Sequence, residues 1–439
     1  MDLLSLLKNI NNFIALPSIF IFLAAGIILT LKTCFIQFRA FPYFLKLFSK
    51  TKSSNVKKDK KSIKTINSVH AMFASMATTL GMGNIVGPSV AIVAGGPGAL
   101  FWLVFFAFFG GVIKYTEVTF ALHTREKTSD GKIMGGPTQY LKLVHQMFSH
   151  WYGFIMIGVF AVWSGIQSNI LSDILAKEGV MPWQTGLFLA GIVLVVLHGG
   201  AKRVGFLSSR LVPIMCFFYV SFALLIIFKD ITLLTKSLKL VFSSAFTSTA
   251  AFGGFAGATL FQAMSAGIYK SVYITEAGLG TSSIAHAVAD VKKPTDQGVL
   301  AMYSIVADAF FSFLSGLLVL VTGVWMTVNS IDNTLMYEVF KMNSPVLGRF
   351  VLIISIALFV ITTVIGNSFN GSQNFSSLTR HRFKKLYHLF TAGMIFWGAI
   401  VEAPLVWELV GTLIVLVAMP NIFGLLYLAF SQSKVLELK

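Results

Sequence analysis

The chain has 439 residues, of which 56% are hydrophobic and only 12% are charged, and its formal net charge at pH 7 is +17. Soluble domains carry about 25% charged residues, so this composition excludes an ordinary soluble protein and indicates a polytopic membrane protein with room for about ten spans of roughly 20 residues. The positive charge does not indicate nucleic acid as a partner, because the basic residues lie in the gaps between apolar segments, where they fix membrane topology. The two cysteines, Cys34 and Cys216, lack metal-ligand spacing, and no disulfide is expected.

The first apolar segment, residues 13–31, carries no charge and is long enough to cross a bilayer. A cleaved signal peptide is the competing interpretation, but only Lys8 supplies positive charge ahead of the run, and the run is longer than a usual signal core. We therefore expect a membrane helix. The loop that follows, residues 32–64, is the most basic of the chain, which places it in the cytoplasm and the N-terminus outside.

The second span, residues 66–93, contains the sequence Thr-Thr-Leu-Gly-Met-Gly-Asn-Ile-Val-Gly from Thr78 to Gly87. No Asp, Glu, Lys or Arg occurs from Thr65 to Ile113, and three glycines stand where a simple anchor has Leu or Val. Glycine lowers helix stability by about 1 kcal/mol relative to alanine, and backbone groups in hydrocarbon must find partners within the protein. We therefore expect the helix to break within residues 78–87 and to line an enclosed cavity.

Nine further apolar segments complete a prediction of eleven spans. They cover residues 99–122, 151–174, 183–197, 211–228, 246–269, 298–328, 350–370, 386–400 and 405–430. Basic residues gather in alternate connections, so an arrangement with the N-terminus outside and the C-terminus in the cytoplasm fits the charges, although one miscounted span would invert the later loops. In this arrangement Lys270 and Lys292 flank a cytoplasmic connection that contains Glu276-Ala277-Gly278-Leu279-Gly280.

The seventh predicted span is interrupted by Gly253-Gly254-Phe255-Ala256-Gly257, which gives a second glycine-broken helix. If the first helix is set aside, the two broken helices are the first of each group of five, and the groups have opposite topology. Interrupted segments at corresponding places in two halves indicate an inverted-repeat secondary transporter. We therefore predict one all-α membrane domain over residues 1–439, with an extra helix at 13–31 and five-helix repeats at 66–228 and 246–430.

A broken helix in a membrane offers a neutral site for a charged solute. Freed N–H groups at the start of a half-helix attract a carboxylate, and unwound carbonyls coordinate a cation. The stretch from Thr78 to Gly87 contains only neutral side chains, including Thr79 and Asn84. The alternative interpretation is close packing, since small residues also let membrane helices approach one another.

Polar residues in other spans have two interpretations each. Thr362 and Thr363 have hydroxyl oxygens that suit a sodium ion, but a membrane threonine more often bonds a carbonyl of its own helix. The side chains of Gln167 and Asn169 either join helices or contact the solute.

Ionisable residues within spans require a functional hypothesis. Asp308 is interpreted either as a coupling or gating residue or as a structural partner of another helix. Lys114 and Glu117 have the spacing of a local ion pair on one helix. We find no nucleophile with a matching base, phosphate loop or metal cluster in the sequence, so an enzyme is not expected and no organic cofactor is predicted.

Several strings of residues are similar to those of the alanine/glycine:cation symporter family, also called sodium:alanine symporters. They are Gly81-Met82-Gly83-Asn84-Ile85-Val86-Gly87, Ala94-Gly95-Gly96-Pro97-Gly98-Ala99 with Phe101-Trp102, Gly135-Gly136-Pro137, Glu276-Ala277-Gly278-Leu279-Gly280 with Ala285-His286-Ala287, Gln297-Gly298, Trp407 and Pro420-Asn421. This resemblance extends from about residue 68 to residue 430. It implies a leucine-transporter-like fold of 5 + 5 inverted repeats after one extra helix, and sodium-coupled uptake of small neutral amino acids such as alanine and glycine.

The resemblance also implies site residues. Sodium would be bound by the carbonyls of Ala77, Leu80 and Phe359 and the hydroxyls of Thr362 and Thr363. The substrate carboxylate would meet the backbone from Thr79 through Gly81 and Met82 to Gly83, while Gly254 and Phe255 would close the other side and Gln167 and Asn169 match a polar pair in the family's fourth helix.

The chain also departs from the family's pattern at three places. Asn367 follows Gly366 where the family has an aromatic run beginning with Trp, so the identity of the amino acid is left open. Gly411 stands at the place of a usual Asp, and Lys270-Ser271 replaces an Arg-Gly pair.

The leading hypothesis is a sodium-coupled amino-acid symporter of the cell membrane, whose partners are sodium, a small neutral amino acid and the lipid bilayer, with no nucleic acid and no obligate protein partner. A second hypothesis is a proton-coupled or exchange-type carrier of the same fold, with Asp308 as a candidate proton carrier. A third, an intramembrane enzyme, would need a second carboxylate near Asp308, and none is evident in the sequence.

Overall fold

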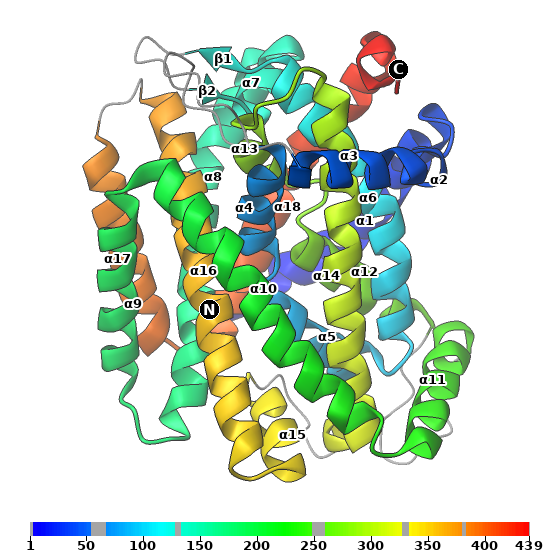
Figure 1. Cartoon of the computed structure of the whole chain (residues 1–439), viewed down its shortest axis with the longest axis vertical. Coiled ribbons are helices and arrows are strands. Elements are labelled where there is room, and N and C mark those ends of the chain that lie inside the picture. The colour runs from blue at the N-terminus through cyan, green and yellow to red at the C-terminus, as the bar shows by residue number, and fades with distance from the viewer. Residues whose placement is uncertain are drawn as a thin grey trace.

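Helices that cross most of the molecule make up nearly all of the described structure (Figure 1). The computed structural model describes residues 3–53, 67–127, 133–247, 260–326, 333–379 and 383–438. The principal helices are α1 (Leu3–Lys32), α4 (Ser68–Thr79), α5 (Met82–Gly95), α6 (Ala99–His123), α8 (Gln146–Ala176), α9 (Pro182–Leu197), α10 (Gly200–Ile227), α12 (Leu260–Thr275), α14 (Pro294–Thr322), α16 (Leu347–Leu378), α17 (Lys384–Ile400) and α18 (Ala403–Ser431).

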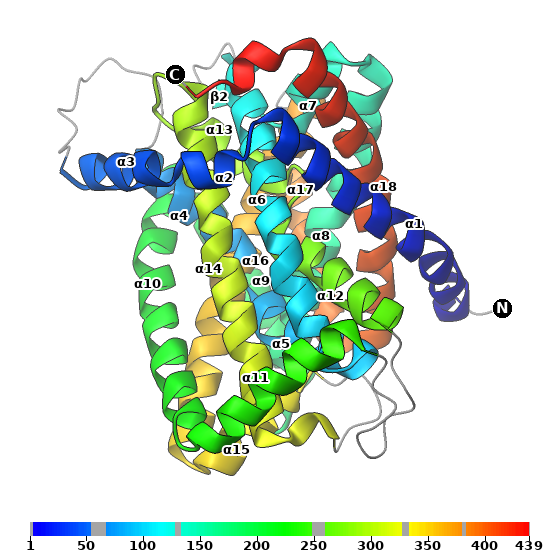
Figure 2. The same cartoon turned by 90° about the vertical axis from the view of Figure 1, so that its right-hand side faces the viewer.

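Shorter elements cover the two ends of this bundle. They are α2 (Ile36–Arg39), α3 (Phe41–Ser53), α7 (Pro137–Tyr140), α11 (Ile231–Phe246), α13 (Thr281–Ala287), α15 (Leu335–Asn343), the 3₁₀ helices η1 (Leu141–Leu143), η2 (Val324–Met326) and η3 (Ser433–Leu436), and an antiparallel pair of strands, β1 (Glu126–Lys127) and β2 (Ile133–Met134). Figures 1 and 2 place α3, the strands and the C-terminus toward one end, here called the α3 end, and α11 and α15 at the other, the α11 end.

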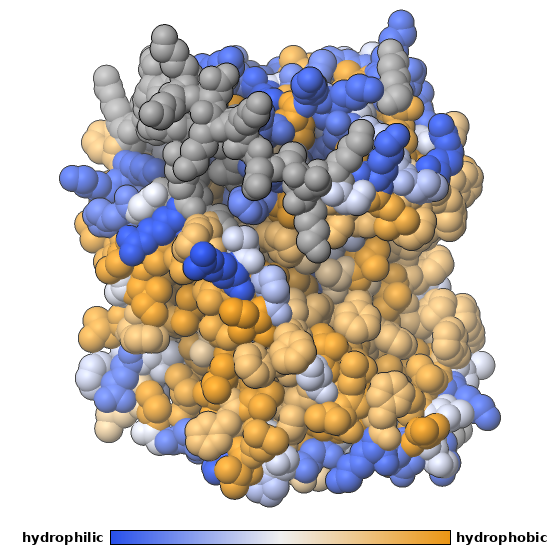
Figure 3. Space-filling model, in the orientation of Figure 1, coloured by the Kyte–Doolittle hydropathy of each residue, from blue (hydrophilic) through white to orange (hydrophobic). Residues whose placement is uncertain are grey.

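The composition of the helices identifies an integral membrane protein. Among the described residues six helices are long and apolar enough to cross a membrane, or up to eight if each of two bent helix pairs forms one span. Figure 3 shows hydrophobic residues across the middle of one face and hydrophilic residues toward both ends of that face. Apolar side chains exposed in such a band are stable in lipid, whereas water would destabilise them.

Most of the predicted spans overlap helices of the structure, while the count of eleven spans stays a prediction. The predicted break of the second span is also present: α4 ends at Thr79, α5 begins at Met82, and the two helices are bent by 42°. The glycines and the lack of charge within residues 78–87 therefore identified a real interruption of the helix.

The predicted end of the seventh span was wrong. Instead of ending at residue 269, its helix α12 continues to Thr275, and the segment Glu276–Gly280 forms a buried turn between α12 and α13. Lys270 caused the error because a lysine usually marks the end of a span, whereas here its ammonium lies 4.0 Å from the ring centroid of Trp407. The predicted break at Gly253–Gly257 lies outside the described residues.

The turn after α12 lies beside the break between α4 and α5. Helix α12 packs against α5 and α6, and α13 packs against α4 and α6. A Cβ atom built on Gly83 in α5 would lie 2.9 Å from Cε1 of Tyr273 near the end of α12. The interrupted pair α4 and α5 is therefore packed against the end of α12 in the interior of the bundle.

Candidate functional site

The first break consists of Leu80 and Gly81, which join α4 to α5 through extended backbone. Gly81 has φ −132° and ψ −163°, and its N–H donates to Thr79 O at 3.0 Å and to Asn84 Oδ1 at 3.2 Å. The Asn84 side chain thus caps the start of α5, which leaves few free backbone donors at this end of the helix.

Gln167 of α8 reaches the first break, as the sequence analysis allowed. Its Oε1 accepts a hydrogen bond from the N–H of Met82 at 3.0 Å, and the side chain is buried. The start of α5 carries the partial positive charge of the helix. The neutral side-chain oxygen of Gln167 therefore accepts from a backbone N–H that would also suit an anion.

Thr363 of α16 meets the same break from the opposite side. Its hydroxyl donates to the carbonyl of Leu80 at 3.4 Å. A Cβ atom built on Gly81 would lie 2.7 Å from Thr363 Oγ1 and 3.2 Å from Gln167 Oε1. Only glycine fits at this position without displacing its neighbours, so Leu80, Gly81, Gln167 and Thr363 form one tightly packed polar cluster.

The other residues proposed for sodium are close by but are engaged differently. Thr362 donates to the carbonyls of Leu358 and Phe359 in its own helix, at 2.9 and 3.0 Å, and its hydroxyl also lies 3.6 Å from Met215 Sδ. Ala77 is fully buried in the last turn of α4. Of the predicted ligands, Thr362 and Phe359 are in contact within α16, and Leu80 and Thr363 are in contact between α16 and the first break.

Asn367 and Asn169 lie in different surroundings. Asn367 is buried one turn beyond Thr363 in α16, and its Oδ1 accepts no hydrogen bond from the described residues. Asn169 donates to the carbonyls of Gly398 and Val401 at 2.9 and 2.7 Å and accepts from Asn333 Nδ2 at 3.1 Å. Its side chain therefore joins α8 to the end of α17 and makes no hydrogen bond to the first break.

The buried turn Glu276–Gly280 between α12 and α13, here called the second break, has three residues in the left-handed region of φ and is a different segment from the break predicted at residues 253–257. Glu276 has φ 56°, Gly278 has φ 88° and Gly280 has φ 74°. Glycine adopts such values without strain, and two glycines within five residues make this reversal of the chain possible. The carboxylate of Glu276 accepts hydrogen bonds from the hydroxyls of Thr281 and Ser282 at the start of α13.

Side chains from three other helices satisfy the backbone of the second break. Glu117 Oε1 accepts from the N–H of Gly280 at 2.9 Å and from Asn421 Nδ2 at 2.8 Å, and Asn421 also donates to the carbonyl of Gly278 at 2.9 Å. The hydroxyl of Tyr152 donates to Leu279 O at 2.7 Å. Sequence reasoning missed this arrangement because its partners lie more than 100 residues apart.

Lys114 pairs with Asp308 and not with Glu117, as had been expected from their spacing on one helix. Lys114 Nζ lies 3.9 Å from Asp308 Oδ2 with both side chains fully buried, and it donates to the carbonyl of Thr275 at the end of α12 at 3.2 Å. Asn84 in turn donates to the backbone carbonyl of Asp308 at 3.2 Å. Asp308 is thus the counter-ion of a lysine that contacts the second break.

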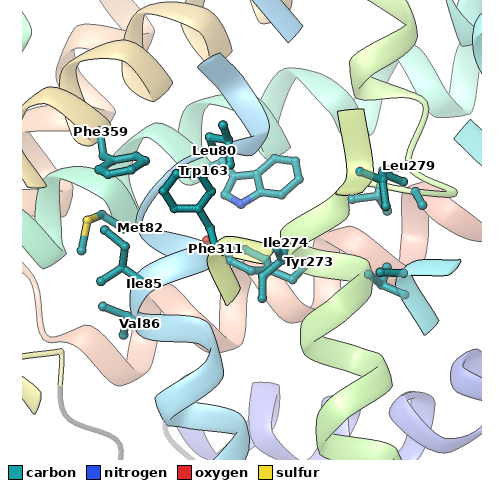
Figure 4. Packing of buried hydrophobic residues seen from close by; sticks show 14 of the residues in the cluster. Leu80, Met82, Ile85, Val86, Trp163, Tyr273, Ile274, Leu279, Phe311 and Phe359 are labelled. Atoms are coloured by element: carbon teal, nitrogen blue, oxygen red, sulfur yellow. The ribbon is translucent and has the colours of Figure 1, made fainter. Parts of the chain in front are cut away.

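Aromatic side chains lie on the elements that flank both breaks (Figure 4). The ring of Tyr273 in α12 has its centroid 5.5 Å from that of Trp163 in α8 and 5.3 Å from that of Trp407 in α18.

The sequence matches the model of the sodium:alanine symporter family over residues 1–438. The chain belongs to the sodium:alanine symporter family. It is 34% identical to the sodium/alanine symporter AgcS of Methanococcus maripaludis, over 98% of this chain and 95% of that protein. It is also 29% identical to the probable sodium/glutamine symporter GlnT of Bacillus subtilis, over 94% and 85% of the two chains, and 28% identical to the putative sodium/proton-dependent alanine carrier protein YrbD of the same organism, over 90% and 83%.

These findings make this member of the family an integral membrane transporter and not an enzyme. Sodium and an amino acid are the transported partners that the family supports. The names of the relatives differ in the amino acid, so they leave the substrate of this chain to be argued from its own residues.

Proposed function

We propose that this transporter carries out sodium-coupled symport of a small neutral amino acid, alanine or glycine, into the cell. The observation that carries the proposal is the polar cluster at the first break, where Gln167 and Thr363 contact the backbone from opposite sides. These groups are neutral and buried, which suits a zwitterion that brings its own charges together with a cation.

The proposed sodium site uses Leu80 and Thr363 as its first ligands. Their oxygens already lie 3.4 Å apart, and a cation between them would replace the hydrogen bond with coordination by both oxygens. The carbonyls of Ala77 and Phe359 and the hydroxyl of Thr362 complete the proposed set. Thr362 would have to turn from the carbonyl of Leu358 to take part.

The proposed amino-acid site lies on the α5 side of the first break. The N–H groups of Gly81, Met82 and Gly83 would bind the carboxylate, with the hydrogen bond from Met82 to Gln167 yielding to the ligand. Asn367, one turn beyond Thr363 in α16, would contribute its unpaired carbonyl oxygen to the ammonium group. Thr79 in α4 completes the proposed amino-acid site. Gly254, Phe255 and Asn169 stay proposals from the sequence.

The fold we propose for this mechanism is leucine-transporter-like, with eleven spans. The first five-helix repeat contains α4 with α5, α6, α8, α9 and α10, and the second contains α12 with α13, α14, α16, α17 and α18; α1 precedes them. The first repeat then begins with the broken pair of α4 and α5, and the second begins with the break proposed from the sequence at residues 253–257, which is the arrangement expected of an inverted-repeat carrier. The N-terminus lies outside the cell membrane and the C-terminus in the cytoplasm.

Uptake into liposomes tests the proposal. The purified protein is reconstituted, and uptake of labelled alanine and glycine is measured with an inward gradient of sodium, of potassium or of protons alone. We expect uptake with sodium only. Uptake driven by protons without sodium would instead favour the proton-coupled carrier. The relative YrbD is named a putative sodium/proton-dependent alanine carrier.

A further inference from the structure

A cavity of about 440 Å³ lies at the α3 end, where α1 turns into α2 and meets the C-terminal η3. Its lining includes Lys32, Arg39 and Glu437. The turn from α1 to α2 is sharp, because Cys34 and Phe35 both have positive φ, 51° and 54°. Tyr115 holds the opposite wall in place by donating to the carbonyl of Leu436 at 2.8 Å.

The two cations of this cavity have no anionic partner among the described residues. Lys32 Nζ lies 4.8 Å from the ring centroid of Phe430, which holds the ammonium at the rim. Arg39 is exposed, and its guanidinium makes no hydrogen bond or ion pair to any residue that the structure describes. Glu437 lines the same cavity without forming an ion pair to either of them. The lining therefore carries a net positive charge.

Helix α3 continues from this cavity across the bundle, roughly perpendicular to the long helices (Figures 1 and 2). Tyr43 donates to Asp296 Oδ1 at 2.7 Å, and the ring of Phe44 lies 4.5 Å from that of Tyr303, so one side of α3 is fixed to α14. Phe38 of α2 and Phe41 and Leu45 of α3 are between 51% and 66% exposed, although the ring of Phe41 also lies 5.8 Å from that of Tyr303. A helix with these faces lies in the interfacial plane of a bilayer.

We propose that this corner binds the headgroup of an anionic phospholipid, with its phosphate between Lys32 and Arg39 and its acyl chains along Phe38, Phe41 and Leu45. The net positive lining favours a lipid of net negative charge over a zwitterionic one. Glu437 then accepts from the hydroxyl groups of a glycerol headgroup, so phosphatidylglycerol is the lipid that matches the whole lining. This site is separate from both helix breaks and does not depend on the proposed transport function.

Native mass spectrometry of the detergent-purified chain tests this site, with dioleoyl-phosphatidylglycerol, -phosphatidylethanolamine and -phosphatidylcholine added singly at equal concentrations. We expect phosphatidylglycerol to bind at the lowest concentration. The double variant Lys32→Gln/Arg39→Gln should weaken that binding by roughly fivefold for each charge removed, the equivalent of ~1 kcal/mol for each basic residue near the headgroups. Thermal unfolding of the variant checks that it is folded.

Two comparisons make the test specific. Arg39→Lys keeps the charge and should retain the preference for phosphatidylglycerol, whereas the matched control Lys229→Gln/Lys239→Gln removes two charges near the α11 end and should leave it unchanged. The proposal is overturned if the first double variant binds phosphatidylglycerol as the parent chain does, or if either zwitterionic lipid binds equally well. It is also overturned if millimolar inorganic phosphate displaces the lipid, since the site would then be one for a soluble anion.

Discussion

The two breaks differ in the side chains that form hydrogen bonds with their freed backbone groups. At the first break the freed backbone groups meet neutral side chains, namely Asn84, Gln167 and Thr363. At the second break they meet the buried acidic side chain of Glu117 as well as Asn421 and Tyr152. The buried Lys114 bonds the carbonyl of Thr275, which comes directly before that break. Hydrogen bonds to charged groups are roughly twice as strong as neutral ones. The second break is therefore fixed to its neighbours, while the first retains partners that a ligand can replace.

The largest expected effect comes from Lys114→Met, which leaves Asp308 as a buried charge without its counter-ion. Removing one partner of a buried pair costs about 3–5 kcal/mol, so the variant should unfold at a clearly lower temperature in detergent. Lys142→Met is the matched control, because Lys142 and its partner Glu126 are 47% and 56% exposed, and exposed pairs contribute about 0–1 kcal/mol. Equal losses in the two variants would contradict a special role for the buried pair.

The next effect in size is that of Gly81→Ala at the first break. The added Cβ would lie 2.7 Å from Thr363 Oγ1, and such overpacking costs typically about 1–3 kcal/mol. Because the clash falls on the proposed sodium ligand, we expect sodium-driven uptake of alanine to be lost while most of the stability remains. Gly158→Ala in α8 is the control, since no atom lies within 4 Å of its added Cβ, and it should transport normally.

Gln167→Ala removes the side chain that accepts from the Met82 N–H. In the proposed site the substrate carboxylate has to displace this hydrogen bond, which contributes about 0.5–1.5 kcal/mol, so the alanine concentration for half-maximal uptake should fall by up to roughly tenfold. Asn169→Ala, two residues further on, should instead lower the unfolding temperature with little change in that concentration, because Asn169 bonds Gly398 and Val401. The opposite pattern would exchange the roles assigned to these two residues.

The smallest effect expected is that of Thr363→Ala on the sodium dependence of uptake. Loss of one hydroxyl ligand should raise the sodium concentration for half-maximal uptake severalfold. Thr362→Ala should raise it less, because Thr362 is bonded to carbonyls of its own helix. Unchanged sodium dependence in Thr363→Ala would remove this residue from the proposed site.

The sequence alone predicted the first break correctly because local composition causes it: glycines weaken a helix wherever they stand. The end of the seventh span was predicted too early because Lys270 resembles the end of a span, and only the packed fold places the ring of Trp407 beside its ammonium. The break predicted at residues 253–257 lies outside the described residues. The sequence also does not show in which direction a side chain points. Thr362 and Thr363 are adjacent in sequence, yet only the latter reaches Leu80.

The hydrogen bonds of Glu117 at the second break restrict how the surrounding elements can move. A single carboxylate oxygen bonds the N–H of Gly280 and the side chain of Asn421, and so links α6, the turn before α13, and α18. Any motion of the transporter that keeps these bonds has to carry all three elements as one rigid block. The hinge of the cycle must then fall elsewhere, and the short link of Leu80 and Gly81 is the place where the chain can flex without dismantling that block.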